Sequence, residues 1–435
     1  MWLRILKMKH QNNYSVEDWL RYLEQNKPQE KINLGLKRVK DVASALNLLR
    51  IECPVISVAG TNGKGSTIAA LESIYFTAGY RVASYTSPHL FAFNERIKIN
   101  QLAISDASLC CAFSAVFNAP GIENLTYFEV VTIVALWHFK MNPVDIILLE
   151  VGLGGRLDAT NIIDADLAII TTIDYDHQAY LGDTKEAIGL EKAGILRKKG
   201  LLVYGDYTPP KSVLAHAKSL NVTLFKLGTD FYFNVIREKL FLTCAENKPV
   251  ECQVPSVQVK SAVSAIVASL VLKKRLPIEL GTIERAMQTV KIVARQQYIP
   301  GTIGTVFDVA HNAQAARSLA DFIVSLPKKK VHVVFAALKD KNLIGLIEPL
   351  VSHADYWYTA KIGDARAVES STLASAFDTA TGVIPPNFND PLAAYMAAKK
   401  EAFEDDLIIV YGSFLTVNAV MGADYQEDMH EFSNG

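Results

Sequence analysis

The feature that most constrains this chain is a glycine-rich turn at residues 60–66, with the sequence GTNGKGS. The apolar run at 54–59 predicts a strand before it, and residues 67–74 predict a helix after it. Glycines let the turn point successive backbone N–H groups inward, and the helix adds its positive N-terminal end. Lys64 supplies a charge for terminal phosphates, and Ser66 a hydroxyl for phosphate or its Mg²⁺. The turn therefore predicts a nucleoside triphosphate site.

The spacing of this turn differs from the common G-x-x-x-x-G-K-[ST] loop, because Gly65 separates the lysine from the hydroxyl. A Gly-Lys pair alone also fits a plain β-turn. The strand before the turn and the helix after it favour phosphate binding over that alternative.

Composition narrows the possible partners. The chain has 435 residues, which predicts two or three domains, and 44 basic against 45 acidic side chains give a net charge of −1. This balance gives no electrostatic case for nucleic acid or an anionic membrane, so small-molecule partners are expected. The five cysteines form no C-x-x-C pair, which argues against disulfides or zinc and favours a cytoplasmic protein. We expect no signal peptide, and residues 130–139, too short to span a bilayer, predict a buried helix.

Strands and helices alternate in both halves of the chain. Apolar runs at 145–150 and 167–173 are typical of parallel strands buried on both faces. Further strands are predicted at 81–87, 201–204, 305–308, 331–335, 356–358 and 407–411, and helices at 15–25, 38–50, 105–117, 126–140, 313–325, 341–351 and 390–403. The fold class is therefore α/β with mostly parallel sheets. We expect an ATPase domain at 1–296 and a smaller Rossmann-like domain at 297–435, frayed from about 424.

Polar residues follow several of the predicted strands, and in open α/β sheets ligands bind at the carboxyl ends of strands. Ser87, Glu150 and His177 occupy such positions. Glu150 fits a Mg²⁺ ligand, with a solvated strand end as the alternative. His177 beside Asp176 fits a metal ligand and a core histidine equally well. Residues 308–312 repeat the strand-tip pattern in the second half, where Asn312 also fits a helix N-cap.

Several motifs in one order carry a family resemblance. They are residues 60–66, 86–90, 150–161, 176–177, 191–195, 308–312 and 412–414. Together they resemble folylpolyglutamate synthase, and more closely its bifunctional dihydrofolate synthase form, over about residues 16–421. The resemblance implies a Mur-ligase-type ATPase domain with a P-loop and a parallel sheet, followed by the Rossmann-like domain.

The resemblance also implies roles for individual residues. It implies catalytic roles for Lys64, Lys192, His177 and His311. It implies nucleotide contacts from Thr61, Asn62, Gly63, Lys64, Gly65, Ser66, Gln258, Arg295 and Asp308, where Gln258 stands in place of the family's usual asparagine. It implies Mg²⁺ ligands, with two sites expected, from Ser87, Glu150, His177 and a carbamylated Lys192. It implies a pteroate site at Lys31, Ile32, Asn33, Leu34, Thr126, Tyr127, Phe128, Glu129, Leu157, Asp158 and Ala159.

The activity implied is ATP-dependent addition of L-glutamate to 7,8-dihydropteroate and to the γ-carboxyl of reduced folates through an acyl phosphate. The expected cofactors are ATP and Mg²⁺, and a monomer is expected. Three alternatives remain open: a folylpolyglutamate synthase only, another Mur-type ligase, or a non-ligating P-loop switch. Peptidoglycan-type Mur ligases carry their own nucleotide-sugar domain before the ATPase, whereas few residues precede Gly60 here.

Overall fold

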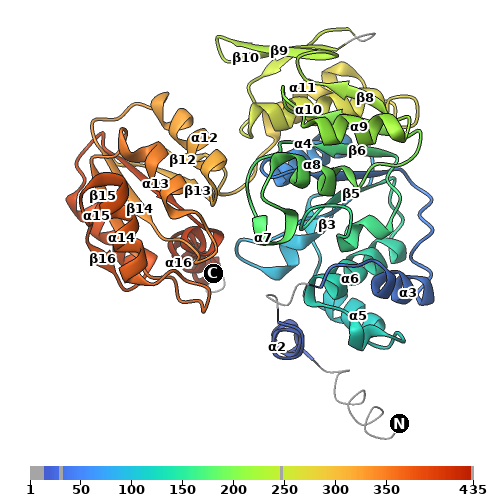
Figure 1. The fold of residues 1–435 in the computed structure, drawn as a ribbon, viewed down its shortest axis with the longest axis horizontal. Helices are drawn as coiled ribbons and strands as arrows, with labels where there is room; N and C mark the ends of the chain where they lie inside the picture. Colours follow the sequence, from blue (N-terminus) through green and yellow to red (C-terminus); the bar gives the residue numbers. More distant parts are fainter. Residues whose placement is uncertain (1–13, 29–32, 245–247, 433–435) are drawn as a thin grey trace, which may run out of the picture. The chain divides into compact units, whose positions relative to one another are not determined.

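The computed structural model describes residues 14–28, 33–244 and 248–432, with side chains through residue 423. It divides into two compact units, Met1–Lys291 and Ile292–Gly435, each built on its own parallel-rich sheet (Figure 1). The division falls shortly before the expected boundary at residues 296 and 297. Two α/β units confirm the predicted fold class.

The main sheet of the first unit has the order β4-β3-β2-β5-β1-β6-β7-β8. Its strands are β1 (Val55–Ala59), β2 (Val82–Tyr85), β3 (Ile97–Ile99), β4 (Leu102–Ala103), β5 (Ile146–Glu150), β6 (Leu167–Ile170), β7 (Leu201–Tyr204) and β8 (Thr223–Lys226). The strands from β2 to β8 in this order run parallel, whereas β3 and β4 are antiparallel additions at one edge. The central strand β1 is buried along its whole length, as its apolar sequence predicts.

Helices cover both faces of this sheet (Figure 1). They are α2 (Val16–Asn26), α3 (Lys37–Ala45), α4 (Lys64–Thr77), α5 (Asp106–Phe117), α6 (Tyr127–Met141), α7 (Gln178–Leu181), α8 (Lys185–Ala193), α9 (Lys211–Ser219), α10 (Val259–Val271) and α11 (Leu280–Thr289). On one face α2, α3, α5 and α6 share a core with Val55 of β1 and with alternate residues of β2 and β5. Helix α4 follows β1 and contacts α10 and α11. The expected buried helix at 130–139 lies within α6.

A small antiparallel sheet of β9 (Phe231–Ile236), β10 (Lys239–Cys244) and β11 (Val250–Gln253) also belongs to the first unit. The sequence analysis did not predict it. Arg237 and Glu238 connect β9 and β10, both with positive φ, at 48° and 63°. Two-residue hairpin turns of this type need positive φ at both central residues, and Asn-Gly is the usual sequence signal for such a turn. Without that signal, the hairpin was not visible in the sequence.

The second unit contains a sheet with the order β12-β13-β17-β14-β15-β16. The strands are β12 (Gln297–Ile299), β13 (Gly304–Asp308), β14 (Val331–Phe335), β15 (Tyr356–Ala360), β16 (Asn387–Phe388) and β17 (Leu407–Tyr411). The helices are α12 (Ala313–Val324), α13 (Leu343–Val351), α14 (Ser370–Thr381), α15 (Pro391–Glu401) and α16 (Phe414–Phe432). All strands except β12 run parallel. This is the predicted Rossmann-like arrangement.

One predicted helix end is wrong, and the C-terminal tail is part of a helix. Helix α3 ends at Ala45 rather than at residue 50, because the chain turns at Asn47, whose φ is 55°. The tail expected to fray from about 424 is helical through Phe432 as part of α16. Its Gln, Glu and Met residues favour a helix, despite the acidic charge of the segment.

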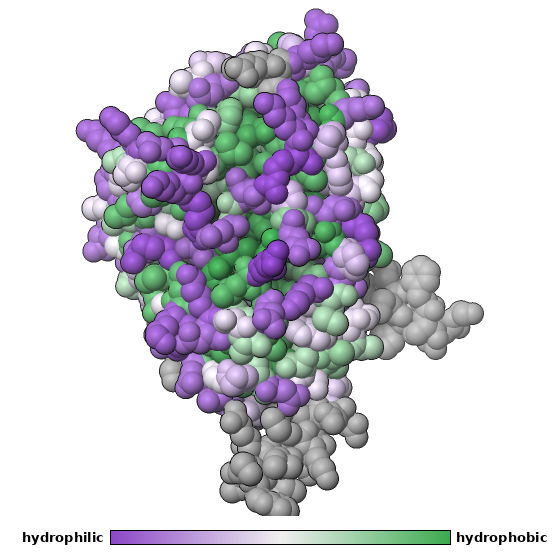
Figure 2. Space-filling model, turned by 90° about the vertical axis from the view of Figure 1, so that its right-hand side faces the viewer, coloured by the Kyte–Doolittle hydropathy of each residue, from purple (hydrophilic) through white to green (hydrophobic). Residues whose placement is uncertain are grey.

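Among the helices of residues 14–28, 33–244 and 248–432, none is long and apolar enough to cross a bilayer. On the face shown in Figure 2, hydrophilic residues are spread across the molecule and separate the exposed hydrophobic ones.

Candidate active site

The glycine-rich turn connects β1 directly to α4, as predicted. Gly60 and Gly63 have positive φ values, 153° and 87°, and Gly63 is the N-cap of α4. A Cβ atom at Gly60 would overlap the Thr171 hydroxyl, and one at Gly63 would lie 2.8 Å from the Ser261 hydroxyl oxygen. Only glycine fits both positions. The turn therefore forms a tight backbone cradle at a helix N-terminus, which suits a phosphate group.

Thr61 and Asn62 secure this cradle to the segment after β6. The Thr61 hydroxyl donates to the Asp174 carbonyl at 3.1 Å and accepts from the Asp174 amide at 3.0 Å. The Asn62 amide donates to the Thr172 hydroxyl at 3.1 Å, and the Asn62 carbonyl accepts from the Thr171 hydroxyl at 2.6 Å. These contacts fix the loop conformation.

Two lysine ammonium groups converge on the cradle. Lys64 Nζ donates to the carbonyls of Gly60 at 3.1 Å and Thr61 at 3.3 Å. Lys192 Nζ, from the last turn of α8, donates to the same Gly60 carbonyl at 2.9 Å. The structure therefore brings together two residues that are far apart in the sequence and that were both predicted to be catalytic. The Lys64 charge favours an anion at this position.

Lys192 has an unusual environment for a lysine, because it is only 4% exposed. Burial, together with the nearby Lys64 charge, lowers the pKa of Lys192 to about 7 against the opposing effect of Asp176 and Asp158. A large share of the Lys192 amine is therefore neutral near neutral pH, and a neutral amine is the form that reacts with CO₂.

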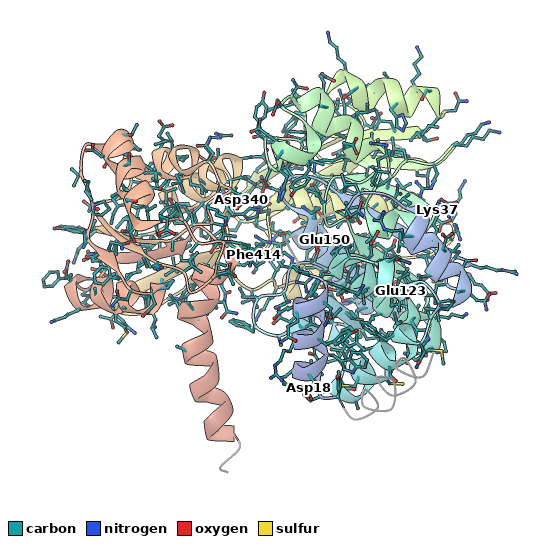
Figure 3. All side chains as sticks on the ribbon, turned by 60° about the horizontal axis from the view of Figure 1, so that its bottom comes forward. Asp18, Lys37, Glu123, Glu150, Asp340 and Phe414 are labelled. Carbon is teal, nitrogen blue, oxygen red and sulfur yellow. The ribbon has the colours of Figure 1, made fainter. Side chains whose placement is uncertain are left out.

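The predicted metal ligands Ser87 and Glu150 also lie together. Strands β2 and β5 are neighbours, and the Ser87 amide donates to Glu150 Oε2 at 3.2 Å. Glu150, labelled in Figure 3, is buried at the carboxyl end of β5. Within the described residues, no group of three His, Cys, Asp or Glu side chains could hold a metal ion. One carboxylate and one hydroxyl beside a phosphate cradle nevertheless fit Mg²⁺, which takes few protein ligands and completes its shell with phosphate and water.

His177 lies in the loop after β6, at the N-cap of α7. Its φ of 50° is unusual for a residue with a side chain, and its side chain is 39% exposed. His177 Nε2 lies 3.9 Å from Asp176 Oδ1. Because Asp176 also acts on Lys192, this loop faces the buried lysine. An exposed histidine in a strained backbone favours the ligand interpretation over a core histidine.

Gln258 lies beside the phosphate cradle. It is the N-cap of α10, and its side-chain oxygen is 3.5 Å from the position that a Cβ of Gly63 would occupy. The hydroxyl of Ser261, one turn later, donates to the Gly63 carbonyl at 3.2 Å. This position is compatible with the predicted nucleotide contact. The positions of the remaining loop residues are also compatible with nucleotide contacts, since Gly65 and the buried Ser66 lie in the first turn of α4.

The predicted pteroate residues fall into two connected groups. Thr126 is the N-cap of α6, and its amide donates to Glu129 Oε2 at 2.8 Å in a capping box. Glu129 Oε1 accepts from Arg38 Nη2 at 2.9 Å, and the same nitrogen donates to the Asn33 carbonyl at 2.6 Å. Glu129 therefore has both oxygens engaged within the protein. Leu34 is exposed, and Lys31 and Ile32 lie outside the described residues.

The second group surrounds the loop after β5. Asp158 is buried, and its oxygens accept from the amides of Gly152, Leu153 and Thr160 and from the Thr160 hydroxyl, at 2.7 to 3.0 Å. Burial raises the pKa of Asp158, and these hydrogen bonds oppose the shift. The neighbours Leu157 and Ala159 flank it, with Ala159 starting a short 3₁₀ helix. Asp158 thus organises the loop rather than standing free.

Two aromatic residues at the start of α6 adjoin this loop. The Phe128 ring lies so close to Gly152 that a Cβ there would be 2.5 Å from it. The Tyr127 ring faces the buried Arg96, whose guanidinium carbon is 5.9 Å from the ring centroid. Phe128 therefore connects the start of α6 to the loop that Asp158 organises.

The predicted residues of the second unit cluster at the end of β13. Asp308 is buried and accepts from the amides of Gln296 at 2.8 Å and Ala310 at 2.6 Å. Burial raises the pKa of Asp308 to about 6, and the charge of Arg295 opposes this shift. His311 Nδ1 lies 2.9 Å from the Val309 carbonyl. Asn312 is the N-cap of α12, the alternative that its sequence position allowed. Its side-chain oxygen accepts a hydrogen bond from the Ala315 amide at 3.0 Å.

The sequence analysis did not assign roles to Arg38 and Phe414. The Arg295 guanidinium lies 4.8 Å from the centroid of Phe414, labelled in Figure 3, and the His311 ring lies 6.1 Å from the same ring. Phe414 therefore lies beside both predicted residues. The sequence shows the capping-box pattern of Thr126 and Glu129. It does not show that Arg38, which is far away in the sequence, pairs with Glu129.

Comparison with known proteins identifies the family of this chain. Residues 58–262 match the family model of the Mur ligase middle domain, and residues 294–414 match the Mur ligase glutamate ligase domain. The dihydrofolate synthase/folylpolyglutamate synthase of Escherichia coli is 36% identical over 422 residues, which cover 96% of this chain and 97% of that protein.

Solved structures show the same fold. The structure of Escherichia coli FolC in complex with DHPP and ADP has a TM-score of 0.90 and 34% identity, and covers 96% of this chain and 99% of that one. A bifunctional folylpolyglutamate synthase/dihydrofolate synthase with Mn, AMPPNP and L-glutamate bound has a TM-score of 0.88 and 36% identity, and covers 95% and 99%. The resemblance predicted from the motifs is confirmed: this chain belongs to the dihydrofolate synthase/folylpolyglutamate synthase family of Mur ligases.

Proposed function

We propose that this chain is an ATP-dependent ligase that adds L-glutamate to 7,8-dihydropteroate and to the γ-carboxyl of reduced folates. The observation that carries the proposal is the convergence of Lys64 and Lys192 on the Gly60 carbonyl, beside a cradle shaped for phosphate. Relatives that cover nearly the whole chain carry both activities in their names. A folylpolyglutamate synthase only is the alternative.

The two-step reaction explains the need for this site. A carboxylate is a poor electrophile, so an oxygen of the acceptor carboxylate first attacks the γ-phosphorus of ATP, and ADP leaves. The glutamate amine then attacks the acyl carbon, a C–N bond forms, and the C–O bond to phosphate breaks. Charge gathers on the transferred phosphoryl group in the first step. Lys64 is placed to neutralise part of that charge.

The proposed metal ligands are Ser87 and Glu150 for one Mg²⁺, and His177 with a carbamylated Lys192 for a second. Bound Mg²⁺ would neutralise phosphate charge and polarise the transferred group. The Lys192 carbamate forms when the neutral amine adds to CO₂ and releases a proton. This change turns a buried cation into an anion, and the low pKa of Lys192 makes the reactive amine available.

The remaining assignments complete the proposal. Arg295 and Asp308 are assigned to the nucleotide and His311 to catalysis, because all three cluster around the end of β13. The first unit would carry the ATPase and pteroate functions, and the second the glutamate ligase function. We propose a cytoplasmic monomer whose partners are dihydropteroate, reduced folates and L-glutamate, in keeping with a net charge of −1.

ADP release tests this function. With ATP and Mg²⁺ present, we expect rapid release only when both an acceptor (dihydropteroate or a reduced folate) and L-glutamate are added, because the site transfers phosphate to a carboxylate rather than to water. Omitting either substrate is the control. Equal ADP release without acceptor and glutamate would contradict the proposal and favour a non-ligating P-loop ATPase.

A further inference from the structure

We infer that Arg38 is a positioning residue for the pteroate-type acceptor, because it holds two separate segments of the candidate acceptor site in one arrangement. Its Nη2 donates to the Asn33 carbonyl at 2.6 Å and to Glu129 Oε1 at 2.9 Å. The inference rests on the proposed function, since both segments were assigned to the acceptor. We call this pair of contacts the Arg38 bridge.

The two contacts of the Arg38 bridge differ in exposure: the ion pair with Glu129 is partly buried, whereas the hydrogen bond to the Asn33 carbonyl is exposed. The side chains of Arg38 and Glu129 are 27% and 7% exposed, so their ion pair is screened less than a surface pair. Within the described residues, the buried Nε of Arg38 has no hydrogen-bond partner. A buried donor without a partner is unfavourable, and a protein rarely retains one without a reason. Because Nε makes no hydrogen bond in the part of the chain that the structure describes, the position of the Arg38 guanidinium depends on the two hydrogen bonds that Nη2 donates.

The bridge continues into the predicted acceptor residues. Glu129 uses its second oxygen to accept from the Thr126 amide, which fixes the first turn of α6. The Phe128 ring in that turn lies against Gly152. A shift of the Arg38 guanidinium would therefore move the Asn33 segment relative to the aromatic start of α6.

A second cation, the buried Lys27, makes a similar connection to the segment before α6. Lys27 Nζ, at the end of α2, donates to the carbonyls of Ile122, Glu123 and Leu125 at 3.0, 3.1 and 2.6 Å. Glu123 is labelled in Figure 3. Lys27 therefore ties the end of α2 to the segment just before Thr126. Both cations act on the α5–α6 connection and the start of α6, whereas the phosphate cradle is held by contacts with Thr171, Thr172 and Asp174.

This separation gives the inference a specific kinetic signature. For Arg38→Met we expect the KM for dihydropteroate to rise at least about 10-fold, while the KM for ATP stays within about twofold. The matched control is Lys37→Met, on the same helix, because the Lys37 side chain is 90% exposed and pairs only at the surface with Asp41 at 3.0 Å. The control should leave both KM values unchanged. A purely structural role for Arg38 would instead reduce the amount of active enzyme and leave KM unchanged.

Arg38→Met leaves the buried Glu129 charge without its partner, which can destabilise the fold. The double variant Arg38→Met with Glu129→Gln removes both charges, and glutamine still accepts from the Thr126 amide. We expect its KM for dihydropteroate to stay raised by about 10-fold. A KM within about twofold of wild type in the double variant, or an equal rise in the KM for ATP, would overturn the inference. Failure of wild-type enzyme to use dihydropteroate at all would contradict the proposed function instead.

Discussion

Replacing Lys64 with alanine is expected to lower turnover by at least about 10³-fold, because it removes the charge that faces the terminal phosphates. The fold should be retained, because Thr61 and Asn62 hold the loop through their own hydrogen bonds to the segment after β6. Steady-state ADP release under saturating substrates measures the effect. A melting curve that matches wild type would show that the loss is catalytic.

A conservative variant makes this result more specific. Lys64→Arg keeps the charge but places a larger, planar group in a tight cradle, so partial activity at most is expected. Turnover of Lys64→Ala close to the wild-type rate would show that the loop does not hold the transferred phosphate.

Lys192→Ala is expected to lower activity by at least about 10²-fold while ATP binding is retained. The physical reason is that the buried amine, with its pKa lowered to about 7, is the group that becomes the carbamate anion. A small carboxylate such as formate in the buffer should restore part of the activity by occupying the vacated position. ADP release with and without formate measures this, and ATP binding is measured by calorimetry.

Lys192→Arg provides the matched control, because its guanidinium cannot lose its charge or form a carbamate. Formate should not rescue it. Full activity of Lys192→Ala, or an unmodified Lys192 amine in a crystal of the active enzyme, would contradict this assignment.

The sequence predicted the elements whose signal is local. Strand β5 is apolar at every position before Glu150, and the turn after β1 carries its glycines in order, so both were predicted from a few adjacent residues. The β9–β10 hairpin was missed because Arg237 and Glu238 adopt positive φ without the usual Asn-Gly sequence. Helix α14 was missed too, because residues 370–381 are small and polar apart from two large apolar residues, Leu373 and Phe377, that reach the core.

In the candidate site, too, only features with a local sequence signal could be predicted. Individual residues such as Glu150 could be proposed from their position at a strand end. The contacts between the site residues could not be predicted. The Gly60 carbonyl, for example, accepts hydrogen bonds from Lys64 in the same loop and from Lys192 on a helix that is distant in the sequence. The burial of a side chain depends on the whole fold. The low pKa of Lys192 therefore cannot be predicted from its neighbours in the sequence. The site assignments themselves stay predictions until the variants are measured.

The most direct test of the account is the mass of the product. The wild-type protein is incubated with ATP, Mg²⁺ and L-glutamate, and with either dihydropteroate or a reduced folate, and the products are analysed by mass spectrometry. The account predicts that each acceptor gains at least one glutamyl residue, with one ADP formed per residue added. Unchanged masses for both acceptors, in a protein that still binds ATP, would contradict it, and a gain by the folate alone would show a folylpolyglutamate synthase only.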